Sequence, residues 1–277
     1  MTRLQRILYR HTSRRKAIAA SVAAALAICA LPTTAVAKPT ILLSGSTSMY
    51  PMIVPLAQSY SANAKFKVLQ GGSDIGIADV ARGRVTIGLS SRDPQPSDPG
   101  GLAFTKVARD GVCLVTNPSN PVGNLSQAQV QQIFSGRIRS WSQIPGARVS
   151  GPIDLIVRTA ASGTQDAFKN IFLGQDINVA GSAAQKPSNG LVQQAVRSNK
   201  NAIGYVSFDF SRGLWAVPYM GVGCTLRAAK SGAYPGTRNF WMVTRGKPGG
   251  AAKSFIDYVK TSSTARRIIA TDWVPLR

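Results

Sequence analysis

The sequence contains no glutamate and a single histidine, His11, and all 11 acidic residues are aspartates. A Ser-His-Asp triad, a Cys-His pair and a histidine metal site each require a histidine. Beyond the N-terminal segment the sequence therefore excludes most ordinary hydrolase designs, although a Ser-Lys nucleophile pair stays open. We expect a protein that is not an enzyme, with no catalytic residues, no metal site and no cofactor.

Long apolar runs are also scarce, and the one at residues 17–31 is shorter than the about 20 residues of a membrane span. Basic residues precede it up to Lys16, and Ala35-Val36-Ala37 follows it as a small-x-small motif. This order is typical of a secretory signal peptide, so we predict cleavage after Ala37 and a periplasmic or secreted protein. Arg14-Arg15 leaves twin-arginine export open, and Cys29 leaves lipoprotein processing open as the weaker alternative.

Only two cysteines, Cys113 and Cys224, follow the predicted cleavage site. An exported protein meets an oxidising compartment, where disulfides form and persist. Because the sequence does not give the distance between the two residues, a disulfide and two separate buried thiols are equal alternatives.

Negative charge is scarce as well. The signal peptide holds six of the 33 basic residues and no acid, which leaves 27 basic and 11 acidic residues and a formal charge of +16. Such a field attracts anions. After residue 37 there is no block of five or six basic residues and no aromatic-rich RNA motif. We therefore expect diffuse surface charge and no nucleic-acid partner.

Apolar runs of strand length alternate with helical patterns, which favours an α/β architecture. The predicted strands are residues 40–44, 66–70, 85–91, 111–117, 152–157, 201–208 and 240–245, and the main predicted helices are 75–83, 125–136, 165–173, 191–198 and 250–258. Ser126 precedes Gln129 by three residues, a spacing typical of a capping box at a helix start.

The segment RTAASGTQDAF, residues 158–168, lies between a predicted strand and a predicted helix. Ser162 precedes Gln165 by three residues, a second capping-box spacing. The N–H groups of a first helical turn can bind an oxyanion, and Gly163 lets the anion approach the backbone closely. Arg158 adds a planar guanidinium, and Ser162 and Thr164 add hydroxyls. A plain helix cap beside a surface arginine is the structural alternative.

Similar small polar residues follow three other predicted strands, in SGSTS (44–48), GGS (71–73) and LSS (89–91). In open α/β sheets, ligands bind beyond the carboxyl ends of the strands. Four such strand ends would form a pocket rich in hydrogen-bond donors.

These motifs together, in this order, resemble the phosphate-binding periplasmic proteins of bacterial ABC transporters, the PstS-like group. The similar segments cover nearly all of the chain after the signal peptide: GSTSMYP, GGSDIGIADVARGRVTIGLSSRD, VARDGVCLVTNPSNPVGNLSQAQVQQIFSGRIRSWSQI, RTAASGTQDAF and NAIGYVSF. The resemblance implies a type II periplasmic binding protein with two lobes, joined by crossovers near residues 108–112 and 219–224. Lobe one would comprise residues 38–108 and 222–277, and lobe two residues 109–221.

The resemblance also implies a ligand site in the cleft between the lobes. Position by position it carries over to the following candidates for contact with phosphate: Ser46, Thr47, Ser48, Ser73, Ser91, Arg158, Ser162, Gly163 and Thr164. The implied function is capture of inorganic phosphate and its delivery to the permease subunits of an ABC transporter in the inner membrane, by a monomer. The alternatives are a receptor for sulfate or another oxyanion, and a secreted phosphatase or esterase.

Ser91 departs from the pattern of many relatives, which have an aspartate there to accept the proton of the phosphate. A hydroxyl can accept or donate, so Ser91 should discriminate weakly between phosphate and sulfate. Asp93 would restore selectivity if its loop turned it inward. Arg92 and Arg109 either contact the anion or form ion pairs with Asp93 or Asp110.

Overall fold

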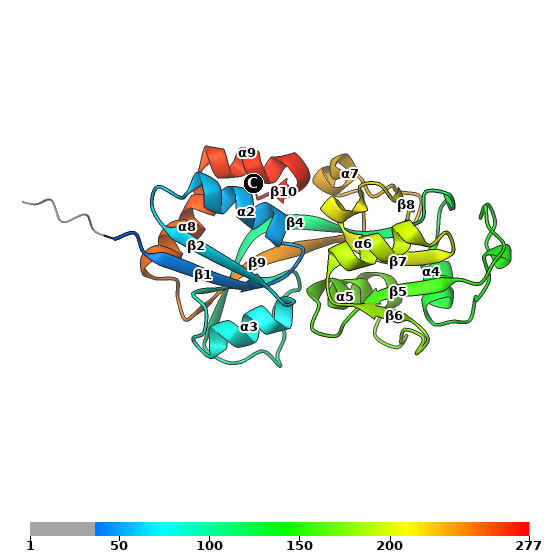
Figure 1. Ribbon diagram of the computed structural model, residues 1–277, viewed down its shortest axis with the longest axis horizontal. Helices are drawn as coiled ribbons and strands as arrows, with labels where there is room; N and C mark the ends of the chain where they lie inside the picture. The colour runs from blue at the N-terminus through cyan, green and yellow to red at the C-terminus, as the bar shows by residue number, and fades with distance from the viewer. Residues whose placement is uncertain (1–36, 277) are drawn as a thin grey trace, which may run out of the picture. The chain divides into compact units, whose positions relative to one another are not determined.

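The longest strand, β4 (Leu102–Thr116), pairs with different strands along its two halves. In the computed structural model, which describes residues 37–276, its first part lies antiparallel to β9 (Thr237–Arg245) and its last five residues to β7 (Ala202–Ser207). The partner changes between Gly111 and Val112, within the span expected for the first crossover. Figure 1 shows β4 and β9 running together between the two halves of the molecule. Residues 1–36 of the predicted signal peptide lie outside the described residues.

The first half of the sheet has the strand order β2-β1-β3-β9-β4, in which β1 is parallel to both β2 and β3. Its elements are β1 (Thr40–Gly45), α2 (Tyr50–Ser59), β2 (Lys65–Gln70), α3 (Ser73–Ala81), β3 (Ile87–Ser90), α8 (Gly250–Thr261), α9 (Ser263–Asp272) and β10 (Val274–Pro275). A core of buried apolar side chains, from Ile41 to Ala108 and from Phe240 to Trp273, packs within this half.

The second half has the order β4-β7-β5-β6, in which β5 is parallel to β6 and β7. Its elements are α4 (Gln127–Phe134), η1 (Trp141–Gln143), β5 (Asp154–Arg158), α5 (Gly163–Phe168), η2 (Lys169–Leu173), β6 (Ala184–Lys186), α6 (Asn189–Ser198), η3 (Phe208–Ser211), β8 (Trp215–Ala216) and α7 (Leu226–Ser231). A second core, from Val112 to Tyr234, packs within this half.

The two cores show how the chain divides between the halves. Val112 belongs to the second core and Ala108 to the first, and Cys224 and Tyr234 still belong to the second. The first core resumes at Phe240. The predicted lobe boundaries at 108/109 and 221/222 stay a prediction, and this packing favours a return to lobe one near residues 235–239.

The sequence predicts a capping box at the start of two helices. The structure confirms it in full at α4 and only in part at α5. Ser126 and Gln129 form the complete capping box at α4. At α5 the Ser162 side chain accepts from the N–H groups of Thr164 and Gln165, but the Gln165 side chain accepts from the hydroxyl of Tyr205 instead of completing the box. A partner 40 residues away thus replaces the local one.

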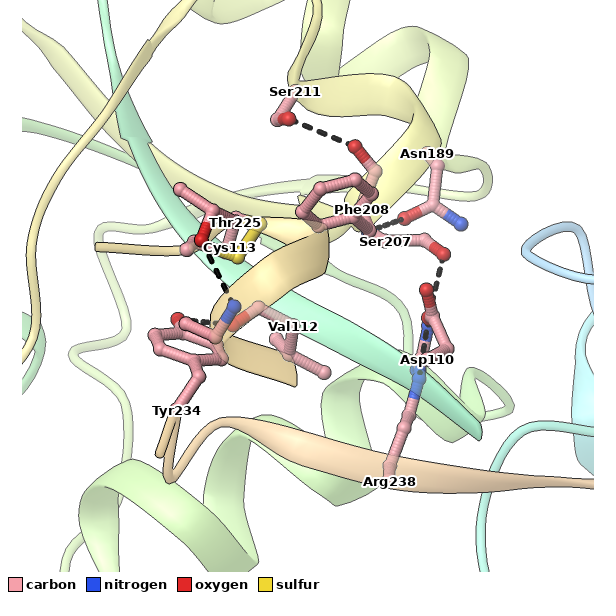
Figure 2. Close-up of a disulfide and its surroundings, with 12 residues drawn as sticks. Asp110, Val112, Cys113, Asn189, Ser207, Phe208, Ser211, Thr225, Tyr234 and Arg238 are labelled. Atoms are coloured by element: carbon pink, nitrogen blue, oxygen red, sulfur yellow. Dashed lines mark hydrogen bonds and ion pairs between the residues drawn. A yellow bond between two sulfur atoms is a disulfide. The ribbon is translucent and has the colours of Figure 1, made fainter. Parts of the chain in front are cut away.

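Cys113 and Cys224 form a disulfide, with their Cα atoms 5.6 Å apart and a separation of 111 positions in sequence. The bond joins β4 to the segment that precedes α7, which decides between the two alternatives that the sequence left open. Figure 2 shows it beside Val112, two residues after Asp110. The disulfide therefore holds the part of β4 that follows the crossover.

We predict that replacing both cysteines by alanine lowers the free energy of unfolding by about 2–5 kcal/mol, because the bond closes a loop of more than 100 residues in the unfolded chain. Urea denaturation of the oxidised protein and of the double variant measures the difference. Reductant should destabilise the parent and leave the double variant unchanged; an equal response of the two proteins would contradict the prediction.

Candidate anion-binding site

The first loop places three buried hydroxyl residues at the end of β1. Gly45 ends the strand with φ 135°, and a Cβ there would lie 2.3 Å from the carbonyl oxygen of Leu89, so only glycine fits. Ser46, Thr47 and Ser48 follow, each less than 5% exposed. Because Gly45 lies so close to the backbone of β3, the loop that follows it lies next to the end of β3.

Ser73 and Ser91 come from the next two strand ends and meet the first loop. Ser91 follows β3, and its N–H donates to the Ser73 hydroxyl over 3.0 Å. The Ser46 hydroxyl donates to that of Ser91 over 2.8 Å. Three loops separated in sequence thus present serine hydroxyls at one point, beyond the carboxyl ends of parallel strands.

The second half of the molecule contributes the SGT turn at the start of α5. Thr164 and Ser48 place their hydroxyl oxygens 3.0 Å apart. A Cβ on Gly163 would lie 2.3 Å from the Ser73 hydroxyl and 2.8 Å from that of Ser91. Glycine at this position therefore lets the two halves meet. The Ser162 hydroxyl accepts from the N–H groups of Thr164 and Gln165 as the cap of this helix.

Arg158 ends β5 and is 2% exposed. Its guanidinium donates to the carbonyl oxygens of Lys186 (3.1 Å) and Pro187 (2.9 Å) and approaches the Thr164 hydroxyl at 3.4 Å. Within residues 37–276 it has no carboxylate partner. Burial, together with the nearby charge of Arg238, lowers the pKa of Arg158 to about 10, while Tyr205 opposes the shift. This is a buried cation without a counter-charge.

The structure thus brings all nine predicted residues into one region and adds residues that the sequence analysis did not name. Arg238 in β9 donates to the Ser48 hydroxyl over 2.8 Å and pairs with Asp110 in β4 at 2.7 Å. Asn189, the first residue of α6, donates to the hydroxyls of Thr47 (3.0 Å) and Ser48 (2.9 Å). Figure 2 shows Asp110 between Arg238 and Ser207, with Asn189 beyond Ser207.

A signal for Arg238 was present in the sequence. Phe240 and Met242 alternate with the half-buried Asn239 and Trp241 along β9, and Arg238 continues the same inward face two residues earlier. A charged side chain on the core face of a strand needs a partner, which marks it as a candidate. Asn189 carried no comparable signal, because it looks like an ordinary residue of a helix start.

The ion pairs with Asp93 or Asp110, which the sequence left open as an alternative for Arg92 and Arg109, do not form among the described residues. Arg92 forms ion pairs with Asp74 (2.7 Å) and Asp98 (2.5 Å). To Asp93 it donates only a hydrogen bond, which the backbone carbonyl accepts. Arg109 donates to the carbonyl of Ala229, and Asp110 pairs with Arg238 instead.

Asp93 does not turn inward. It is exposed, and its carboxylate accepts from the side chains of Asn239 and Trp241. The loop after β3 is held instead by Asp98, whose pKa Arg92 and the N–H of Gln95 keep below its usual range although burial opposes them. Asp93 therefore cannot restore selectivity at Ser91.

The family model described as a PBP superfamily domain matches residues 32–263. The chain belongs to the PBP superfamily. The phosphate-binding protein PstS of Bacillus subtilis (strain 168) is 28% identical over 235 residues, which cover 82% of this chain and 77% of that protein.

Two solved structures of PBP-superfamily proteins show the same fold. One, from Clostridium perfringens, is described as a phosphate ABC transporter substrate-binding protein with bound phosphate; it has a TM-score of 0.81 and 29% identity and covers 86% of this chain and 100% of its own. The other, described as an ABC-type phosphate transport receptor from Vibrio cholerae, has a TM-score of 0.70 and 27% identity and covers 85% and 100%.

These PBP-superfamily relatives confirm the resemblance to PstS-like proteins and the two-lobed type II fold. Their names describe a phosphate-binding protein, a transporter substrate-binding protein and a transport receptor, and none of these names describes an enzyme. Among the described helices of the chain, none combines the length and the apolar character that crossing a membrane requires.

Loss of charge at the two buried arginines should destabilise the protein to different extents. We predict that Arg238→Met destabilises the protein by about 3–5 kcal/mol, because it leaves the Asp110 carboxylate buried without its cation. Arg158→Met should cost clearly less, because it removes a charge that has no counter-charge. Urea denaturation in a buffer free of phosphate and sulfate measures both, and equal costs would contradict the assignment of Arg158 as the uncompensated cation.

Proposed function

We propose that this protein is an exported, non-catalytic receptor that captures inorganic phosphate in the cleft between its lobes and delivers it to the permease of an ABC transporter. The observation that carries the proposal is Arg158, a buried guanidinium with no carboxylate partner within residues 37–276, at a point where hydroxyls from both lobes meet. Burial of an unpaired charge is costly, and a bound oxyanion would supply the missing partner.

The site residues follow from the same geometry. Arg158 and the SGT turn would bind the anion from lobe two, and Ser46, Ser48, Ser73 and Ser91 from lobe one. Arg238 would add a second guanidinium, since it already contacts Ser48. Hydroxyl and N–H donors together can surround a small tetrahedral anion on several sides.

The enclosure of the site favours a small ion over an organic ligand. Contacts between the lobes close it on several sides: the Asp74 N–H donates to the carbonyl of Ala161 over 3.2 Å, and the Gln95 amide donates to Asp166 over 2.7 Å. Asp166 is half-buried, and burial raises the pKa of its carboxyl, although Arg92 and Gln95 oppose the shift. A ligand that contacts both lobes binds the closed form better and shifts the population toward it.

The predicted signal peptide supports export, and the relatives support partnership with an ABC transporter. Delivery to the permease subunits, and action as a monomer, belong to the proposal. A secreted phosphatase would need a base beside one of the serines. The serine hydroxyls of the site contact one another, Thr164, Asn189 and Arg238 among the described residues, and none of these is a general base at neutral pH.

Calorimetric titration of the protein with phosphate, after bound anions are removed by partial unfolding and dialysis, tests the function. We expect one site per chain and no turnover of a chromogenic phosphate ester. A titration that detects sulfate but no phosphate would replace phosphate by sulfate as the ligand, and turnover of the ester would favour the enzyme.

We predict that Arg158→Lys weakens phosphate binding about ten- to a hundredfold although the charge is kept, because lysine lacks the planar pair of donors. A charge-assisted hydrogen bond is worth roughly 1.5–3 kcal/mol, which corresponds to that range. Calorimetry measures the change, with Arg212→Lys, at an exposed surface arginine, as the matched control. Unchanged affinity would place the site elsewhere.

Gly163→Ala should prevent closure. Its methyl group would collide with the Ser73 and Ser91 hydroxyls and with the backbone nitrogen of Arg92, at 2.9 Å. We predict that the variant folds, binds phosphate at least about tenfold more weakly, and shows no decrease in radius of gyration on addition of phosphate. Small-angle scattering compares it with Gly181→Ala, a control in which the added methyl meets no atom within 4 Å. Closure by the Gly163 variant like that of the control would show that the lobes do not meet at this glycine.

A further inference from the structure

Residues 117–125 follow β4 and form a loop that holds together one end of lobe two. The Asn117 side chain donates to the carbonyl of Arg197, near the end of α6, over 2.7 Å. The Asn120 side chain accepts from the N–H of Arg148 over 3.0 Å. Figure 1 shows β8 and α4, which adjoin this loop, in the part of lobe two that faces away from lobe one. The loop therefore brings segments that are distant in sequence together at this end.

Trp215 in β8 is bound to the same loop. Its indole N–H donates to the carbonyl of Val122 over 2.6 Å, which satisfies the only polar group of the side chain. Trp215 is nevertheless 40% exposed, so apolar ring surface faces solvent. Tryptophan is enriched where membranes meet water, because one part of the ring system is apolar and the other donates a hydrogen bond.

Met220 is bound to the end of the loop, where its N–H donates to the carbonyl of Leu125 over 3.0 Å. With Gly221 it forms a two-residue turn, which two hydrogen bonds between Tyr219 and Val222 close. Its φ of 52° is the only positive φ of a non-glycine residue within residues 37–276. Turns of this kind favour asparagine or glycine at that position. Met220 is 57% exposed, so neither the turn nor the core accounts for a methionine there.

The chain around this loop is basic and free of acids. Residues 111–153 and 177–208 contain no aspartate. Five basic residues of these two segments are exposed and form no ion pair within residues 37–276: Arg137, Arg139, Arg148, Arg197 and Lys200. Asp154, at the start of β5, is half-buried and accepts from the Asn199 amide, and it offsets one of these charges. A hollow of about 610 Å³ is lined by Arg148 and Lys200, with room for a phosphate group between them.

We propose that this end of lobe two binds the surface of a membrane that contains anionic phospholipids. The distal surface, defined by Arg148, Arg197, Lys200, Trp215 and Met220, supplies both parts of such a contact. The basic side chains attract the lipid phosphates, and the two apolar side chains enter the layer of headgroups. A bilayer is favoured over a soluble polyanion such as DNA, because only a bilayer offers an apolar environment to Trp215 and Met220.

Membrane binding at the distal surface is independent of the cleft. The lobes contact each other where Ser48 meets Thr164 and where Gln95 donates to Asp166, and none of these residues belongs to the distal surface. A membrane would hold lobe two and leave lobe one free to move. The inference therefore does not rest on which anion the cleft binds.

Co-sedimentation of the exported protein with vesicles tests the proposal. We expect binding to vesicles of phosphatidylglycerol and phosphatidylcholine in equal parts, and at least about tenfold weaker binding to phosphatidylcholine alone. The double variant Trp215→Ser/Met220→Asn should lose at least about tenfold in affinity for the anionic vesicles. Leu69→Ser removes an exposed apolar side chain of lobe one, 52% exposed, and is the matched control that should bind like the parent. Calorimetry with phosphate checks that each variant keeps its cleft.

A second pair of variants separates a local surface from the charge of the whole protein. Arg148→Gln/Arg197→Gln should weaken binding to the anionic vesicles about tenfold or more. Arg266→Gln/Arg267→Gln removes two exposed arginines from α9 in lobe one and leaves the same net charge, so it should change binding much less. Equal losses in the two double variants would show that diffuse attraction carries the binding, and would overturn the proposal.

Three other results would also overturn it. One is an absence of binding to the anionic vesicles at low salt. Another is displacement of the vesicles by saturating inorganic phosphate, which would place a lipid headgroup in the cleft. The third is binding to DNA that weakens in the Arg148/Arg197 variant, together with vesicle binding that is unchanged in the Trp215/Met220 variant, which would assign the surface to soluble polyanions. If the protein binds anionic vesicles as expected but binds no phosphate, this inference stands and the proposed function fails.

Discussion

The ion pair between Arg238 and Asp110 is the contact on which the arrangement of the site depends. It joins the two strands that run between the lobes, at the end of their shared ladder, where Asp110 is paired with Arg238 in register. A buried ion pair adds little net stability compared with apolar residues of the same size, since both charges lose their water. Its value here is geometric, because it holds one guanidinium beside Ser48, and it leaves one carboxylate oxygen of Asp110 without a hydrogen-bond partner in the part of the chain that the structure describes.

Around this pair, the site is composed of small groups. Serine and threonine hydroxyls from three loops of lobe one and one loop of lobe two touch each other directly. Glycines at positions 45 and 163 allow the approach, since a methyl group at either would collide with the neighbouring loop. Small side chains leave little room at the point where these loops meet, which is consistent with the proposed binding of a small ion.

Charge is distributed on two scales. The predicted mature chain carries +16, which attracts anions from solution at a rate that salt reduces. Within the site, two arginines face one aspartate, and Arg92 is neutralised separately by Asp74 and Asp98. The long-range field thus raises the rate at which anions encounter the protein. The charge of Arg158 would attract a bound anion inside the site, where water is excluded and electrostatic interactions are stronger.

The sequence by itself determined many of the helices and strands and four of the strand ends, because apolar periodicity, glycine and helix caps act over a few residues, but it did not show α9 or the first part of β4. The Ser126 cap, β1, β7 and the hydroxyl-rich loops are of this kind, and the motif order was enough to identify the family. Only the tertiary structure decided the partners: Arg238 reaches Asp110 across 128 residues, Asn189 reaches Thr47 across 142, and Cys113 finds Cys224 across 111. These contacts depend on how β4 and β9 pass between the lobes, and no local pattern specifies which of several chemically equivalent arginines and aspartates will meet there.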